Sequence, residues 1–144
     1  MITPFDIKLA VNNLLLEKIP SVPVKAQDVS KGFARPSMTV ELDDVKIETL
    51  ECQIEMSLTV RTFYFPDLKD NEKSIDVLTM QFLLAQTYGN KIYVADRALN
   101  VNEPNAVVTD GILVHEFNTL FYQEVEEEEL PMMIETLVYN GEWG

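Results

Sequence analysis

The first eighteen residues have the pattern of an amphipathic helix. Thr3, Pro4 and Asp6 suit a helix start: Thr3 can accept a hydrogen bond from a free backbone N–H, Pro4 fits the first turn, and Asp6 complements the positive helix end. Pro20 ends the pattern, and the spacing predicts a helix over about residues 4–18. The expected buried stripe consists of Ile7, Val11, Leu14 and Leu15.

Apolar and polar residues alternate along the next segments, which is typical of strands with one buried and one solvated face. Short strands are expected at 22–26, where Pro23 requires a sheet edge, and near 38–42. The clearest alternation runs through 51–65, with Cys52 and the following even-numbered residues on the core face. This position predicts a buried, unreactive thiol for Cys52.

Aromatic residues interrupt this alternation at the end of the long strand. Phe63 and Phe65 continue the polar positions and should emerge on the solvated face. Two interpretations stay open: the next helix caps them, or another subunit does, since aromatic side chains that leave a polar face are typical of interfaces. The loop over residues 30–36, which precedes the strand near 38–42, carries another aromatic residue that looks exposed. The candidate interface residues are therefore Phe33, Arg35, Phe63 and Phe65.

A helix, strands and a hairpin are predicted for the second half of the chain. Helical spacing predicts a helix over about 72–88 that ends at Gly89-Asn90. Its buried stripe is expected to consist of Ile75, Leu78, Phe82 and Leu83. Asp110-Gly111 is a hairpin signal. Strands are expected at 91–99, 105–109 and 112–123, followed by an acidic junction and a short helix over about 131–138.

The predicted elements follow the order helix, three strands, helix, three strands, helix. Strands joined by turns favour an antiparallel sheet, and the helices would pack on one of its faces. We therefore expect residues 1–144 to form a single α+β domain. Its mainly antiparallel sheet would have about five to six strands, with two long helices and a short C-terminal helix packed on it.

The composition supports a folded domain and argues against some classes of binding partner. Apolar residues make up 47% of the chain, so disorder does not explain its acidity. The 24 Asp and Glu residues outnumber 11 Lys and Arg, giving a net charge of −13, which argues against binding nucleic acid through its phosphates. No apolar run approaches the roughly 20 residues that span a membrane. One cysteine and an N-terminus without a signal-peptide pattern predict folding in a reducing cytoplasm.

The acidity is concentrated at the C-terminal end. The last 21 residues, from Glu124, hold 7 acidic residues and no basic one. One interpretation is a solvated connector whose charges favour the start of the next helix. Another is a surface that faces DNA without attracting it, or that binds a basic partner. The candidate residues are Glu124, Glu126, Glu127, Glu128 and Glu129.

Residues suited to catalysis are sparse. The sole imidazole, His115, lies in an alternating strand and is expected to be a buried structural residue. The five glycines are isolated in turns, so no phosphate-binding loop is predicted, and one Cys with one His cannot form a Cys/His zinc set. Asp96, Glu103 and Asp110 could meet at strand ends, but chance proximity is expected among so many acidic residues. We expect no catalytic residues, no cofactor and no metal.

Several short motifs follow one another along nearly the whole chain. They are the helix from Ile2-Thr3 to Leu16, Lys31-Gly32-Phe33 with Pro36, Val40-Glu41-Leu42, Phe63-Tyr64-Phe65-Pro66, Asp96-Arg97 with Leu99, Asp110-Gly111-Ile112-Leu113 before Phe117 and Phe121, and the acidic run before Met132, Met133 and Leu137. In this order and spacing the chain resembles the tail terminator, or tail completion, proteins of long-tailed bacteriophages and prophage-derived tail particles.

The resemblance implies a structural virion protein and not an enzyme. Such proteins form a ring, usually of six copies, that caps the tail tube, ends its elongation and offers the surface for joining the head. The implied partners are further copies of the chain, the tail tube protein, a neck or connector protein and, in contractile tails, the sheath protein. DNA would pass through the ring, with the acidic segment 124–129 lining the lumen or lying on the outer rim. The implied location is the virion tail, after assembly in the host cytoplasm.

Two other functions are compatible with the sequence. One is another neck or head–tail connector protein of the same particle. The other, from a different class, is an acidic DNA mimic that inhibits a host enzyme. A mimic should spread its carboxylates at phosphate-like spacing, whereas these cluster at the C-terminal end of the chain. The sequence therefore favours the terminator.

Overall fold

A computed structural model of the chain describes residues 1–25, 35–67 and 70–124, and of residues 70–74 the backbone alone. Its elements are α1 (Pro4–Lys18), β1 (Val24–Lys25), β2 (Ser37–Leu50), β3 (Gln53–Phe65), α2 (Asp70–Tyr88), β4 (Lys91–Val94), β5 (Arg97–Asn100), β6 (Asn102–Thr109) and β7 (Ile112–Glu124). The predicted interface residue Phe33, the acidic residues Glu126 to Glu129 and the helix predicted at 131–138 lie outside the described residues.

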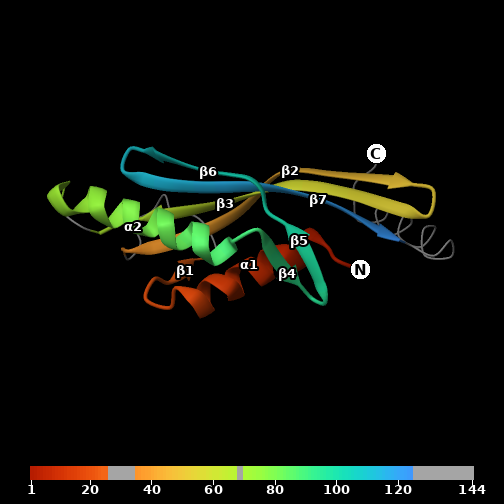
Figure 1. The fold of residues 1–144 in the computed structure, drawn as a ribbon, viewed down its shortest axis with the longest axis horizontal. Helices are drawn as coiled ribbons and strands as arrows, with labels where there is room; N and C mark the ends of the chain where they lie inside the picture. Colours follow the sequence, from red (N-terminus) through yellow and green to blue (C-terminus); the bar gives the residue numbers. More distant parts are fainter. Residues whose placement is uncertain (26–34, 68–69, 125–144) are drawn as a thin grey trace, which may run out of the picture.

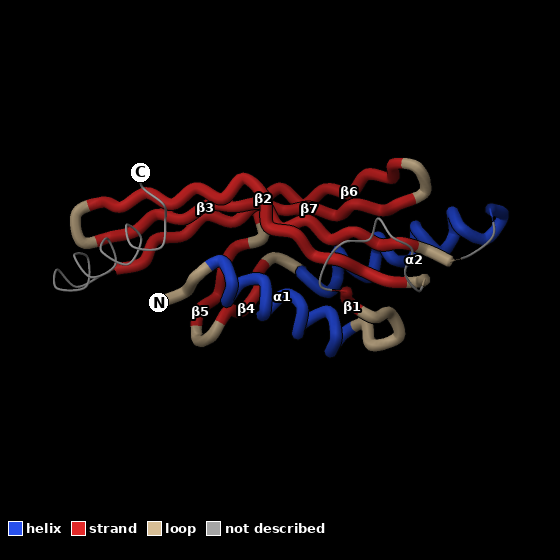
Figure 2. Tube along the Cα trace, turned by 180° about the vertical axis from the view of Figure 1, so that it is seen from behind, coloured by secondary structure: helices blue, strands red, loops and turns tan. Residues whose placement is uncertain are grey.

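Long strands form an elongated sheet, and both helices lie on one of its faces (Figure 1). The sheet has five strands in the order β1-β2-β3-β7-β6, and β4 pairs with β5 in a separate two-stranded sheet. This small sheet lies on the same side as the helices (Figure 2). All these elements contribute residues to one hydrophobic core or pack directly against it, as the α+β prediction requires.

The sheet is mainly antiparallel, as the sequence predicted, but one parallel pair makes it mixed. β1 pairs with β2 in parallel, through Val24 opposite Met38, and the other neighbouring strands of the sheet are antiparallel. The prediction of an edge strand at Pro23 is confirmed, since β1 is the first strand in the order of the sheet. The Pro23 carbonyl accepts a hydrogen bond from the Met38 N–H of the neighbouring strand. The strand predicted at 91–99 is two strands, because Ala95 adopts a positive φ of 56° and turns the chain.

The start of α1 is as predicted. Asp6 N donates to Thr3 Oγ1 (3.2 Å), and Thr3 N donates to the Asp6 carboxylate (2.9 Å), which together form a capping box. Ile7, Val11 and Leu15 are buried, and Leu14 is half-buried against the core. Just before the helix, the backbone of Ile2 exchanges two buried hydrogen bonds with the Gln123 side chain. The start of α1 is thereby attached to the end of β7.

The register of β3 and β7 determines which side chains enter the core. The two strands pair from Gln53 opposite Glu124 to Tyr64 opposite Leu113. Even positions of β3 and odd positions of β7 point to the helix side and are buried there. The predicted hairpin at Asp110-Gly111 is confirmed, with φ values of 51° and 77° that suit a tight hairpin turn.

The hairpin between β2 and β3 differs from the prediction at both of its strands. β2 continues to Leu50, well beyond the predicted end, with a register shift between Asp43 and Lys46. Cys52 lies in the turn with a positive φ of 64° and is exposed. The prediction of a buried thiol is therefore wrong: the alternation is regular, but the strand begins only at Gln53.

Candidate functional site

Helix α2 buries the face opposite to the predicted one. The residues that enter the core are Val77, Met80, Leu84 and Tyr88. The predicted stripe is wrong: Ile75 is 68% exposed, Leu78 and Phe82 are each 64% exposed, and Leu83 is 37% exposed. Apolar residues lie on both sides of this helix, so its periodicity alone did not identify the side that meets the sheet.

Two hydrogen bonds from the sheet hold α2 in this orientation. The hydroxyls of Thr62 and Tyr88 lie 2.5 Å apart in the core, and the Tyr64 hydroxyl donates to the Asp76 carboxylate at 2.6 Å. Burial raises the pKa of both tyrosines above the ordinary value, so both hydroxyls stay protonated. Each bond pairs a polar group that would otherwise be costly to bury.

His115 is a core residue, as predicted. Its ring lies 5.3 Å from that of Tyr88 and 6.4 Å from that of Phe117, and among the described residues its Nδ1 has no hydrogen-bond partner. Burial lowers the pKa of His115, and the opposing effect of the Glu116 charge is smaller. Cys52 lies beyond the other end of β7, so the two residues do not form a catalytic pair.

The lowered pKa of His115 makes stability depend on pH. Below about pH 6.5 the unfolded chain binds a proton that the buried ring does not, so the free energy of unfolding falls as the pH decreases toward the pKa of the folded state. We expect the loss between pH 7.5 and pH 5.5 to be smaller for His115→Gln than for the wild type, by up to about 1.4 kcal/mol per pH unit. Urea unfolding at both pH values measures this, and equal losses would contradict it.

The end of β3 brings together three of the four predicted interface residues. Phe63 and Phe65 stack with ring centroids 6.5 Å apart, Phe63 half-buried and Phe65 buried. The Arg35 guanidinium lies 5.7 Å from the centre of the Phe65 ring, and its Nη1 donates to the Pro66 carbonyl. Helix α2 bonds to Thr62 and Tyr64, on the opposite face of the strand, so it does not supply the expected cap.

The face of the sheet opposite the helices carries a central ionic cluster. Arg61 binds Asp43 through Nη1 at 2.5 Å and Glu116 through Nε at 2.8 Å, with Asp44 at 3.8 Å. The bond to Asp43 is the largest of the effects that raise the pKa of Arg61. These groups are partly exposed, so the cluster contributes little to stability and mainly orients charge on this face.

The carboxylates Asp96, Glu103 and Asp110, which were not expected from the sequence to form a site, do not gather into one in the structure. Glu103 accepts a hydrogen bond from the Asn118 amide, while Asp96 and Asp110 lie in two different turns. In the part of the chain that the structure describes, no three metal-ligating side chains gather. Of the predicted acidic segment only Glu124 is described, at the exposed end of β7. Nearby, the charge of Glu55 raises the pKa of Tyr122, so this end of the sheet is acidic.

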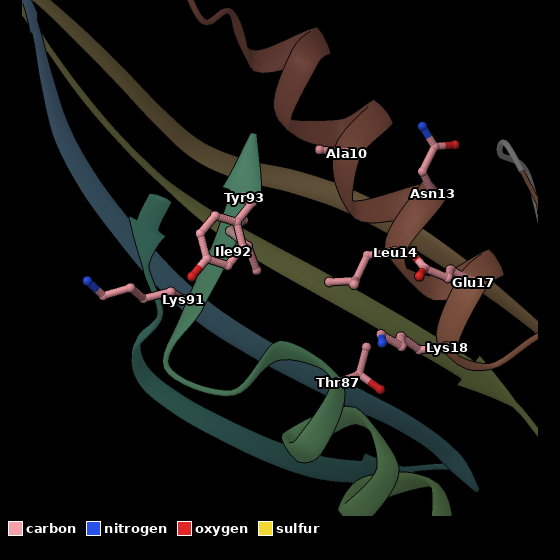
Figure 3. A pocket seen from close by; sticks show the side chains of 9 residues that line it. All are labelled: Ala10, Asn13, Leu14, Glu17, Lys18, Thr87, Lys91, Ile92 and Tyr93. Atoms are coloured by element: carbon pink, nitrogen blue, oxygen red, sulfur yellow. The ribbon is translucent and has the colours of Figure 1, made fainter. Parts of the chain in front are cut away.

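An open groove of about 530 Å³ lies between α1, the end of α2 and β4 (Figure 3). Its lining combines apolar side chains with two lysines and one glutamate: Ala10, Asn13, Leu14, Glu17, Lys18, Thr87, Lys91, Ile92 and Tyr93. None of these nine residues is His, Cys or Ser. Local residue patterns do not indicate this groove, because it depends on how three segments that are distant in the sequence pack together.

A second exposed apolar stripe runs along α1. Phe5, Leu9 and Leu16 recur at spacings of four and seven residues, which places them on one side of the helix, and all three are exposed. Charged residues accompany them along the helix, among them Asp6 and Lys8. Both helices thus present large apolar side chains to solvent. The sequence feature that indicates this in both is a number of apolar residues greater than one buried helix face can use.

Comparison with known proteins identifies a family for this chain. None of the described helices is both long and apolar enough to cross a membrane. No curated protein matches the chain. A family model described as phage tail terminator protein matches residues 6–131, which covers α1 from Asp6 onward, α2 and every strand in the described part of the chain. The chain therefore belongs to the phage tail terminator protein family, whose members have a structural role in the assembly of the bacteriophage tail.

Proposed function

We propose that this protein caps the tail tube as a ring of identical subunits, ends tube elongation and provides the surface to which the head is joined. The family match over residues 6–131 is the observation that carries the proposal. The ring would have six copies, as the family resemblance implies. Its other partners would be the tail tube protein, a neck or connector protein and, in a contractile tail, the sheath protein.

The surfaces of the subunit support a ring. A closed ring needs a head-to-tail contact, in which two different patches of each subunit meet. The described chain offers separate apolar surfaces on α1 and α2, together with the half-buried Phe63 at the end of β3. A monomeric protein rarely exposes this many large apolar side chains on neighbouring elements.

The charge of the subunit supports passage of DNA without binding. At a net charge of −13, a ring of several copies would repel the phosphates of DNA passing through its lumen. Glu124 and the acidic residues after it would contribute on the lumen or on the outer rim. The role needs no catalysis, and the one imidazole of the chain is buried between aromatic rings.

Tail tubes growing in vitro test this function. Adding the purified protein to polymerising tail tube protein should stop elongation, with one ring at the end of each tube in electron micrographs. The same amount of heat-unfolded protein is the control and should leave tube lengths unchanged. Continued elongation at saturating native protein would reject the proposed function.

A further inference from the structure

Strand β2 lies at one side of the large sheet, and β1 covers only a short part of its outer edge. β1 pairs with β2 through Val24 opposite Met38 and Lys25 opposite Thr39. From Val40 to Leu50 the outer edge of β2 pairs with no strand in the described part of the chain, while its other edge pairs with β3. The hairpin that joins β2 to β3 projects beyond both helices (Figure 1, Figure 2). This free edge is therefore open to another molecule.

The backbone groups of β2 turn alternately toward β3 and toward the free edge, as in any antiparallel pair. The Met38 N–H donates to Pro23 of β1, so Met38, opposite Tyr64, turns outward. β3 pairs with β7 without a register shift, so every even-numbered residue of β3 that pairs with β2 opposes an outward-turned residue. Beyond the register shift of β2 these residues are Ile47 and Thr49. Their N–H and C=O groups point to the free edge, where no described strand bonds to them.

Two carboxylates of like charge lie beside these backbone groups. Glu48, next to the free edge, is directly opposite Glu55 on the outer face of the sheet. The ion pairs among the described residues all belong to Arg61, so neither carboxylate is neutralised by one. Like charges directly opposite each other destabilise a sheet, and their negative potential also raises the pKa of the neighbouring Tyr122. A basic side chain placed beside Glu48 would relieve this repulsion.

The other face of the edge is apolar. Ile47 opposes Met56 on the helix side of the sheet, and 53% of its surface is exposed. A strand added here would place alternate side chains beside Glu48 and against Ile47. The edge therefore favours an extended segment in which basic and apolar residues alternate.

A second copy of the chain does not offer such a segment at its described sheet edges. From Glu41 to Glu51 the β2 edge has five acidic residues and one lysine, so two such edges would repel each other. The β6 edge, Asn102–Thr109, has no basic residue. Nucleic acid would be repelled by the same carboxylates. The chemistry of this edge thus selects a different protein.

We propose that the edge of β2 from Lys46 to Leu50 binds an extended segment of another tail protein as an added strand, with basic side chains beside Glu48 and apolar side chains against Ile47. The inference rests on the proposed function, which supplies the other tail proteins. Pairing with the backbone of Ile47 and Thr49 would hold the segment, and the flanking side chains would select it. β1 pairs along the same side of β2, so this side already accepts a strand.

Amide hydrogen exchange of the full chain, measured by NMR, tests the inference. The probe is a short capped peptide that alternates lysine and valine. At saturating peptide we expect exchange at the N–H groups of Ile47 and Thr49 to slow by about tenfold or more, because each gains a backbone partner. Binding without this protection would overturn the inference, since it would reflect charge attraction alone. Protection that appears without peptide and rises with protein concentration would also overturn it, because a second copy would then occupy the edge.

A second peptide controls for composition. It contains the same lysines and valines in two separate blocks, so its charge is unchanged but its side chains no longer alternate. We expect it to bind more weakly and to leave exchange at Ile47 and Thr49 unchanged. Equal protection by the two peptides would contradict the inference.

A proline variant tests the backbone contact. Ile47→Pro removes an outward N–H without removing a bond to β3, and the affinity for the alternating peptide should fall by about threefold to tenfold. Val108→Pro is the matched control on the β6 edge. Thr109 opposite Ile112 closes the two-residue hairpin, so the Val108 N–H also turns outward, and this variant should bind as the wild type does. Circular dichroism checks that both variants fold.

A charge variant tests the selection and does not depend on the proline. Glu48→Lys replaces attraction by repulsion and should also weaken binding of the alternating peptide by about threefold to tenfold. Asp96→Lys makes the same change of charge in the turn between β4 and β5 and should have a smaller effect. Equal effects of these two variants would contradict the proposed position of the added strand.

The peptide experiments use the protein alone, whereas tube length reports on the proposed function. If the peptide protects Ile47 and Thr49 but the native protein does not stop tube growth, the proposed function fails and the strand-binding edge stands. If growth stops and neither amide is protected, the function stands and the inference about β2 is wrong.

Discussion

Replacing Leu84 by alanine is expected to lower the free energy of unfolding by about 2–5 kcal/mol. Leu84 is 0% exposed and lies in the core beneath the sheet, so the shorter side chain leaves a cavity as well as losing apolar burial. Helix propensity does not account for the loss, because alanine is at least as good a helix former as leucine. Urea unfolding followed by circular dichroism measures the change.

Leu78→Ala is the matched control in the same helix. Its side chain is 64% exposed in the single subunit, so we expect a change within about 0.5 kcal/mol. The chemical change and the helix are the same for both variants, and the difference between them isolates burial. A loss at Leu78 as large as that at Leu84 would mean that α2 packs through the face originally predicted from its sequence.

The orientation of α2 illustrates where sequence analysis is insufficient. The position of the helix was predicted within about two residues, because Gly89 ends it and helical spacing persists up to that point. Its buried side was not, since Ile75, Leu78 and Phe82 are as apolar as Val77, Met80 and Leu84. The contacts of α2 with β7, among them Tyr88 against Phe117 at 5.0 Å, and its hydrogen bonds to Thr62 and Tyr64 of β3 distinguish the two sides.

Helix α1 and strand β3 could be predicted because local signals determine them. Thr3 and Asp6 form the capping box that the sequence suggests, and strict alternation identifies the core face of β3. The second half of β2 has no such signal. Its residues from Glu41 to Thr49 are mostly exposed, and the strand is held by long-range pairing with β3. Local patterning does not encode a strand whose two faces are both solvated.

The sequence indicated which residues could form an interface, but not which of them the fold exposes. An exposed-looking aromatic pair at Phe63 and Phe65 was visible in the sequence, but its burial beside Arg35 depends on the packing of the chain around the end of β3. The exposed apolar stripe of α2 was visible too, and was interpreted as core. An apolar stripe becomes a candidate contact only when another stripe of the same helix is known to fill the core.

Thr62→Val is expected to lower the free energy of unfolding by about 1–3 kcal/mol. The two side chains have nearly the same shape, so the packing of β3 against α2 is preserved. The Tyr88 hydroxyl, which lies 2.5 Å from Thr62 Oγ1 in the core, loses its partner and stays buried. Tyr88→Phe should lower the free energy of unfolding by a similar amount, since it leaves the Thr62 hydroxyl unpaired.

The double variant Thr62→Val/Tyr88→Phe distinguishes a hydrogen bond from simple packing. It removes both polar groups together, so its loss should be smaller than the sum of the two single losses by about 0.5–3 kcal/mol. Thr119→Val is the control, because Thr119 is equally buried and, among the described residues, its hydroxyl has no hydrogen-bond partner. It should be neutral or stabilising. Strictly additive losses in the double variant would show that the Thr62–Tyr88 bond does not hold α2 to the sheet.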